Sequence, residues 1–173
     1  MSTNWRYFPQ TSMPPKQLLD VVAAFDANHD KFASPHNKLN SNSVLACVAN
    51  NLQRAGFDVE RGKSEAALIK VPVLYGENGI VEKFFCADAF HPSTGTVVEV
   101  EASRATVNFQ FLKDFYEFCM MQDAQYLCIA VRNLDEGGGA KSKDYEKVVL
   151  FFTTLFASER MQIPLKGIMI IGY

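Results

Sequence analysis

The residues best suited to chemistry are three acids near the middle of the chain, Asp88, Glu99 and Glu101. The segment Thr96–Glu101 is typical of a β-strand, in which side chains alternate between two faces. Glu99 and Glu101 therefore share one face, and the valines beside them occupy the other. Two buried carboxylates without partners would raise the pKa of at least one of them. Such a pair is suited to binding a hard cation or to moving protons.

Asp88 joins this pair if the segment before it forms a hairpin with the strand just described. With Pro92–Gly95 as a four-residue loop, His91 pairs with Thr96, and Asp88 lies opposite Glu99 on the same face. A five-residue loop would place Asp88 on the other face instead. The first register predicts three converging carboxylates, which Mg²⁺ or Mn²⁺ would neutralise. In the alternative interpretation, the glutamates lie on the solvated face of an edge strand and the aspartate only forms a turn.

Nearby basic residues could supply contacts to phosphate. Arg104 follows the strand at a helix start, where it could bind phosphate with two parallel hydrogen bonds or simply face solvent. Lys63, Lys70 and Lys83 surround the early strands and could form a local basic track, or serve solubility alone. His91 is expected to be a turn residue, with a role beside a metal as the alternative.

The pattern of apolar residues and turn formers predicts one α/β domain with a mixed central sheet and helices on both faces. Residues 1–13 are expected to be an irregular arm, and residues 29–41 a loop. Helices are expected to start at Pro14–Pro15 and continue to Asp26, from a cap at Asn42 or Ser43 to Gly56, over 106–121 and over 142–157. Strands are expected over 57–60, 67–75, 82–90, 96–101, 126–131 and 167–171.

Composition and charge narrow the class of protein. Hydrophobic residues make up 48% of the 173 residues and aromatic residues 12%, which excludes a disordered chain. A net charge of −2 gives no overall basic field, so a nucleic acid would have to meet a local patch. The four cysteines show no paired spacing and are expected to be reduced thiols of a cytoplasmic protein. No apolar run is long enough to cross a bilayer, so no membrane partner is expected.

The order of elements around Asp88, Glu99 and Glu101 resembles the PD-(D/E)xK nuclease superfamily. A helix, strands, the motif Asp-(x)10-Glu-x-Glu, a helix and a strand follow one another, roughly over residues 41–173. The third motif position is usually Lys, and Glu101 resembles the variant found in BamHI-type and BglII-type restriction enzymes. The run from Asp88 through Arg104, then Phe111–Asp114 and Ala130–Arg132, also looks like a widespread group of small uncharacterised proteins with this fold.

The resemblance implies a three-layer, restriction-endonuclease-like α/β core over residues 41–173, with residues 1–40 as an arm and helix packed on it. It implies that Asp88 and Glu99 bind Mg²⁺ or Mn²⁺. Glu101 would be a further ligand or the base for the attacking water, and Arg104 would contact phosphate. Many relatives carry a further acid on the first core helix, where this chain offers Asn50 and Asn51.

The function expected from this resemblance is a metal-dependent endonuclease that hydrolyses double-stranded DNA. A homodimer would suit an enzyme that cuts both strands. One alternative is a catalytically degenerate nuclease-fold module that binds nucleic acid or a protein. Another is a plain α/β interaction protein whose acids are merely on its surface.

Overall fold

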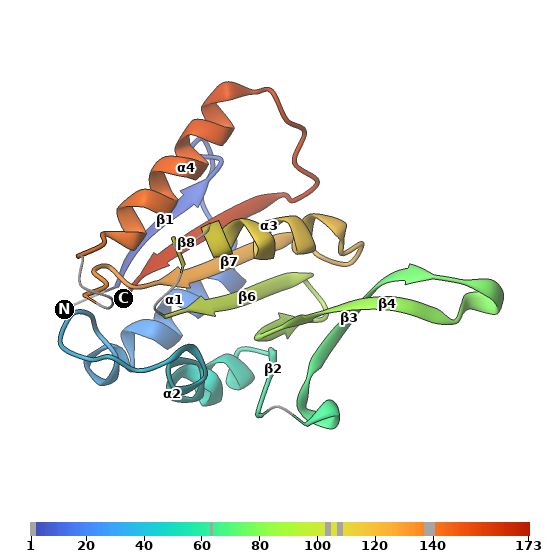
Figure 1. Ribbon diagram of the computed structural model, residues 1–173, viewed down its shortest axis with the longest axis horizontal. Coiled ribbons are helices and arrows are strands. Elements are labelled where there is room, and N and C mark those ends of the chain that lie inside the picture. The colour runs from blue at the N-terminus through green and yellow to red at the C-terminus, as the bar shows by residue number, and fades with distance from the viewer. Residues whose placement is uncertain (1–2, 63, 103–104, 107–108, 137–140) are drawn as a thin grey trace.

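A six-stranded mixed β-sheet runs through the middle of the molecule, and helices cover both of its faces (Figure 1). The computed structural model describes residues 3–62, 64–102, 105–106, 109–136 and 141–173. In spatial order the strands are β1 (Asn4–Phe8), β8 (Gly167–Gly172), β7 (Tyr126–Val131), β6 (Thr96–Glu101), β5 (Ala89–His91) and β2 (Asp58–Val59). Strands β6, β7 and β8 are parallel, and the outer pairings are antiparallel. The predicted three-layer α/β architecture is confirmed.

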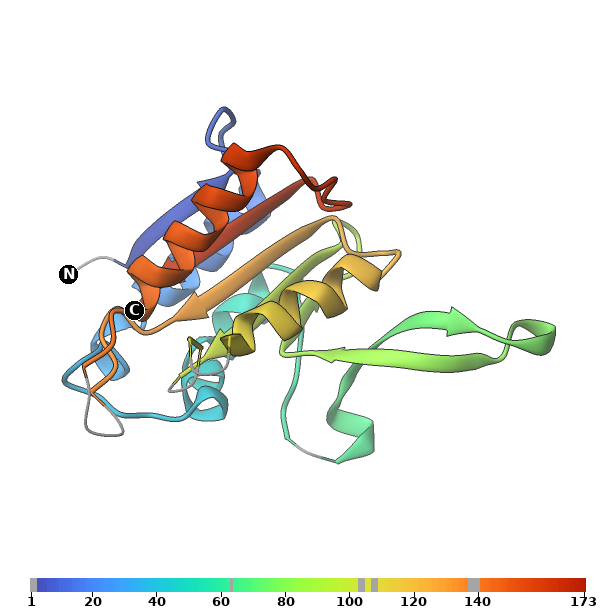
Figure 2. The same cartoon turned by 45° about the horizontal axis from the view of Figure 1, so that its top comes forward.

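Two helices pack on each face of the sheet, as the two views together show (Figures 1 and 2). Helices α1 (Lys16–Asp26) and α2 (Ser41–Arg54) bury their apolar stripes against side chains such as Val98 and Val100 of β6. Helices α3 (Gln110–Met120) and α4 (Asp144–Ser158) cover the opposite face. The alternation along β6 therefore turns Val98 and Val100 toward α1 and α2, and its two glutamates, together with Val97, toward the side of α3.

The N-terminal segment is part of the sheet, so the expectation of an irregular arm over residues 1–13 is wrong for Asn4–Phe8. This strand pairs with β8 from Asn4 opposite Gly172 to Phe8 opposite Ile168. Phe8 is fully buried and stacks on Phe156 of α4. A contact between the two ends of the chain leaves no local sequence signal, which is why the strand was not expected. The proposed domain division at residue 40 stays a prediction.

Two helix starts also differ from the prediction. Helix α2 is capped by Asn40, whose Oδ1 accepts a hydrogen bond from the Ser43 N–H at 2.9 Å, so it begins before Asn42. Helix α3 begins at Gln110 rather than near residue 106, because Phe109 has a left-handed backbone with φ of 54°. In the described part of the chain, no helix has both the length and the apolar character that a bilayer crossing requires.

A two-stranded ribbon, β3 (Ile69–Tyr75) and β4 (Val81–Ala87), projects from the body of the molecule (Figures 1 and 2). Its base is packed beneath α3, where Val71 and Ala87 are buried. The ribbon turns outward after this point, and its far end lies away from the sheet. The segment 82–90 was expected as one strand, but β4 ends at Ala87 and β5 starts at Ala89, with Asp88 between them.

Candidate metal and phosphodiester site

The hairpin that carries the acids has the predicted register. His91 lies opposite Thr96 and Ala89 opposite Val98, so the loop is Pro92–Gly95. Asp88 directly precedes the paired residues and lies beside Glu99. Gly95 fits this loop because its φ is 62° and an added Cβ would lie 2.1 Å from the Asp123 carbonyl oxygen. The hairpin thus brings Asp88 to the face on which Glu99 and Glu101 lie.

Asp88 and Glu99 are linked through the backbone. The Asp88 N–H donates to Glu99 Oε1 at 3.1 Å, and Asp88 Oδ2 accepts from the Val100 N–H at 2.8 Å. The Asp88 side chain therefore takes the hydrogen bond of a backbone N–H group of β6, and this accounts for the break between β4 and β5 at Asp88. The other carboxylate oxygen of Asp88 forms no hydrogen bond with the described residues. Both acids are held, half-buried, at the same position in the sheet.

A fourth carboxylate, Asp114 of α3, completes the cluster and was not predicted as a site residue. Only 6% of Asp114 is exposed, and its Oδ2 has no hydrogen-bond partner in the described structure. Asp114 lies close enough to Glu101 to raise the pKa of the Glu101 carboxyl. The sequence held a signal for this residue, since an acid lies among Phe111, Phe115 and Phe118 on the apolar stripe of the helix. A buried polar atom without a partner costs free energy unless a ligand or proton satisfies it.

Lys113 brings a positive charge to the edge of this carboxylate cluster. Its Nζ lies 3.7 Å from Asp114 Oδ1 and 3.2 Å from Glu117 Oε1. The lysine side chain is 59% exposed, so solvent screens much of its effect. It lowers the pKa of Glu101 only in part, against the burial and repulsion that raise it. The cluster therefore retains an excess of negative charge when all of its carboxyls are ionised.

Burial and mutual repulsion raise the pKa of every carboxyl in the cluster. Burial first, and then the charge of Glu60, raise the pKa of Asp88 to about 7, although the hydrogen bond from Val100 acts in the opposite direction. Burial together with Asp114 raises the pKa of Glu101 to about 8. The pKa of Glu99 lies well above its ordinary value, and that of Asp114 is also raised. Near neutral pH the cluster therefore holds protons where a cation could replace them.

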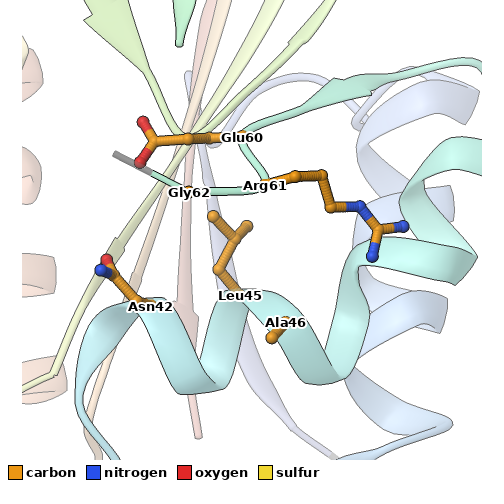
Figure 3. A pocket seen from close by; sticks show the side chains of 6 residues that line it. All are labelled: Asn42, Leu45, Ala46, Glu60, Arg61 and Gly62. Carbon is orange, nitrogen blue, oxygen red and sulfur yellow. The ribbon is translucent and has the colours of Figure 1, made fainter. Parts of the chain in front are cut away.

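Glu60 extends the negative charge toward a neighbouring cavity of about 260 Å³ (Figure 3). The Glu60 N–H donates to the Asp88 carbonyl oxygen at 2.8 Å, continuing the pairing of β2 with β5. The cavity lies between the start of α2 and the segment Glu60–Gly62. Arg61 lines it too, but its side chain points away from Glu60, and its Nη2 donates to Asn50 Oδ1 at 2.9 Å.

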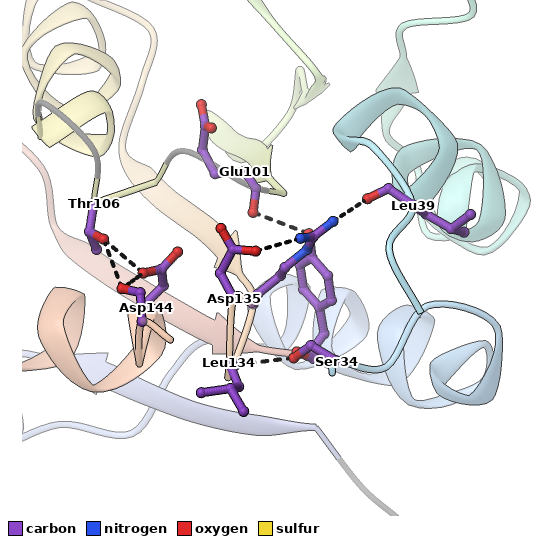
Figure 4. A network of polar contacts seen from close by, with 10 residues as sticks. Ser34, Leu39, Glu101, Thr106, Leu134, Asp135 and Asp144 are labelled. Atoms are coloured by element: carbon purple, nitrogen blue, oxygen red, sulfur yellow. Dashed lines mark hydrogen bonds and ion pairs between the residues drawn. The ribbon is translucent and has the colours of Figure 1, made fainter. Parts of the chain in front are cut away.

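A buried polar network fixes the ends of the parallel strands next to the cluster (Figure 4). The Tyr173 hydroxyl donates to the Glu101 carbonyl oxygen at 3.1 Å. Arg132 donates to Asp135 Oδ1 and to the Leu39 carbonyl oxygen, each at 2.8 Å. The Glu101 carboxylate points away from this network in Figure 4, so Tyr173 holds the β6 backbone at Glu101 while the acid itself lies outside the network.

None of the other predicted site residues that the structure describes joins the cluster. His91 packs edge-on against Phe57, with ring centres 4.9 Å apart, on the sheet face opposite the acids, so a role beside a metal is wrong. Lys70 and Lys83 lie on the projecting ribbon, where Lys70 pairs with Glu65 at 2.7 Å. Arg104 and Lys63 lie outside the described residues, and their contacts with phosphate stay predictions.

The carboxylates are close enough to interact but are not arranged as a preformed metal centre. Among the described residues, no group of three His, Cys, Asp or Glu side chains has the geometry of a metal site. One carboxylate oxygen of Glu99 and one of Asp88 instead accept hydrogen bonds from the backbone N–H groups of Asp88 and Val100. Binding a cation would require these side chains to release their protons and rotate.

Comparison with protein-family models, with curated proteins and with solved structures gave no match to this chain.

Proposed function

We propose that this chain is a divalent-metal-dependent phosphodiesterase that hydrolyses DNA, with a restriction-endonuclease-like core. The observation that carries the proposal is the convergence of Asp88, Glu99 and Glu101 from one hairpin with Asp114 from α3, whose Oδ2 is buried without a partner. Oxygen-only ligands of this charge suit Mg²⁺ or Mn²⁺. The resemblance of the Asp-(x)10-Glu-x-Glu motif to the PD-(D/E)xK nucleases supports the same reaction.

The residues divide into ligands and a base. Asp88, Glu99 and Asp114 would hold the cation, which supplies charge stabilisation for the phosphate and lowers the pKa of water. Glu101 would take a proton at its carboxylate from the water whose oxygen attacks phosphorus. The phosphorus–oxygen bond on the far side then breaks, and the leaving oxygen takes a proton from solvent. Arg104 stays the predicted contact to a phosphate oxygen.

Purified protein incubated with supercoiled plasmid is expected to nick or linearise the plasmid with Mg²⁺ or Mn²⁺ and to leave it intact with EDTA. Glu99→Gln should abolish cleavage, because it removes a charged oxygen ligand while it keeps the shape of the side chain. Glu146→Gln is the matched control, since Glu146 is exposed on α4 and pairs with Lys143. Plasmid binding without cleavage would favour the degenerate module. Cleavage that persists in Glu99→Gln would contradict the proposal.

A further inference from the structure

The far end of the β3–β4 ribbon exposes apolar side chains to solvent. We call this surface the ribbon tip, defined by Leu74, Tyr75, Ile80, Val81 and Phe84, all of which are exposed. The most exposed of them is Ile80, at 66%. A two-stranded ribbon has two open edges and is marginally stable without further packing. Clustered exposed apolar side chains of this kind mark an interaction surface.

An apolar groove lies at the other end of α3. We call it the α3–α4 groove. It has a volume of about 420 Å³ and is lined by Thr106, Phe109, Phe111, Lys147, Leu150 and Phe151. Phe109 and Leu150 are 62% and 66% exposed. The groove lies where α3 begins, whereas the ribbon extends past the end of the body at which α3 finishes (Figure 1). A chain therefore cannot place its own ribbon tip in its own groove.

The two surfaces carry charged residues of opposite sign that form no ion pair among the described residues, and Lys83 also lies beside the tip. Glu77 and Glu82 flank the apolar residues of the ribbon tip, and in the described structure neither forms an ion pair. The carboxylate of Glu82 lies across Gly76, where an added Cβ would be 1.9 Å from it. At the groove, Lys147 donates to Ser142 Oγ at 2.8 Å, and no carboxylate of the described residues forms an ion pair with it. A glutamate of the tip could therefore pair with this lysine.

These features favour a protein surface over DNA as the occupant of the groove and as the partner of the ribbon. From Ile69 to Ala87 the ribbon carries two glutamates and two lysines, and Lys70 is already paired with Glu65. A surface without an excess of basic residues lacks the positive field that a phosphate backbone requires. The tip and the groove are instead complementary to each other in both apolar character and charge.

We propose that two copies of this chain form a two-fold dimer in which each ribbon tip docks in the α3–α4 groove of the other copy. Since the tip and the groove lie at opposite ends of the molecule, a two-fold axis across its long dimension brings both pairs together. Reciprocal docking doubles the apolar area that is buried and leaves no unpaired tip. This inference does not depend on the proposed nuclease activity.

Sedimentation equilibrium of the full chain over a range of concentrations tests the dimer. Ile80→Glu at the tip and Leu150→Glu in the groove should each raise the dimer dissociation constant at least tenfold, because each buries a charge in an apolar contact. Met13→Glu is the control, since Met13 is 79% exposed and belongs to neither surface. Circular dichroism confirms that each variant is folded.

A charge exchange makes the test specific to the proposed contact. Glu82→Lys and Lys147→Glu should each weaken the dimer, and the two substitutions together should restore it to near the wild-type dissociation constant. A wild-type chain that is monomeric at every concentration would overturn the proposal. So would a dimer that none of these variants weakens, or variants that weaken plasmid binding while the dimer persists.

Discussion

Glu101→Gln is expected to lower plasmid cleavage by about 10²-fold or more, the usual scale for loss of a positioned base. Glutamine keeps the shape and volume of the side chain but cannot accept the proton from water. The metal-free fold should be unchanged or more stable, because burial and Asp114 already raise the pKa of Glu101 to about 8. DNA binding should persist or strengthen, since one negative charge near the phosphates is lost.

The test compares wild type with Glu101→Gln and with the control Glu146→Gln. The cleavage rates at equal Mg²⁺ concentration and the melting temperatures are measured for all three proteins. If Glu101 were a surface acid, activity would be unchanged and stability would change by no more than a few tenths of a kcal/mol. A Glu101→Gln protein that cleaves at the wild-type rate would remove Glu101 from the mechanism, even if the chain proved to be a nuclease.

In EDTA, the free energy of unfolding should fall as the pH rises from about 5 to about 8. The folded cluster keeps its protons because the pKa of Asp88 is raised to about 7 and that of Glu101 to about 8, whereas the unfolded chain releases them at ordinary values. The folded state therefore binds more protons in this range, and stability is lost as they leave. Asp114→Asn should make this fall shallower. It should stabilise the protein at pH 8 by about 1–3 kcal/mol, the cost of one unsatisfied buried polar group.

Urea unfolding at pH 5 and pH 8 measures both effects. Asp123→Asn is the matched control, because Asp123 is exposed after α3 and outside the cluster. A stability that is flat or rises between these pH values would show that the four carboxyls do not share buried protons. An Asp114→Asn protein less stable than wild type at pH 8 would assign this residue a purely structural role.

Local patterns predicted the strands of the site well. The bounds of β6 and β7 match the segments expected from sequence, because β6 alternates polar and apolar residues after a turn and β7 is a short apolar run. The register of the acid-bearing hairpin followed from the length of its loop and from the period of two along a strand. These two features are sufficient to place Asp88 and Glu99 on one face.

Such local patterns do not predict contacts between segments that are distant in the sequence. Asp114 joins the cluster only because α3 crosses the face of β6, and its place on an apolar stripe gave the only indication. The pairing of β1 with β8 joins residues more than 150 positions apart. Strand β4 ends before Asp88, whose side chain accepts a hydrogen bond from the Val100 N–H. Strand propensities do not encode a bond of this kind.

We expect Asp88, Glu99, Glu101 and Asp114 to bind a divalent cation together. Titration of the protein with Mn²⁺, followed by the electron paramagnetic resonance signal of the free ion, tests it most directly. Wild-type protein is expected to remove Mn²⁺ from solution, and excess Mg²⁺ should displace it. Asp88→Asn together with Glu99→Gln should abolish binding in a folded protein. Wild-type protein that leaves the free Mn²⁺ signal unchanged at millimolar concentration, or a double variant that binds as well as wild type, would contradict it.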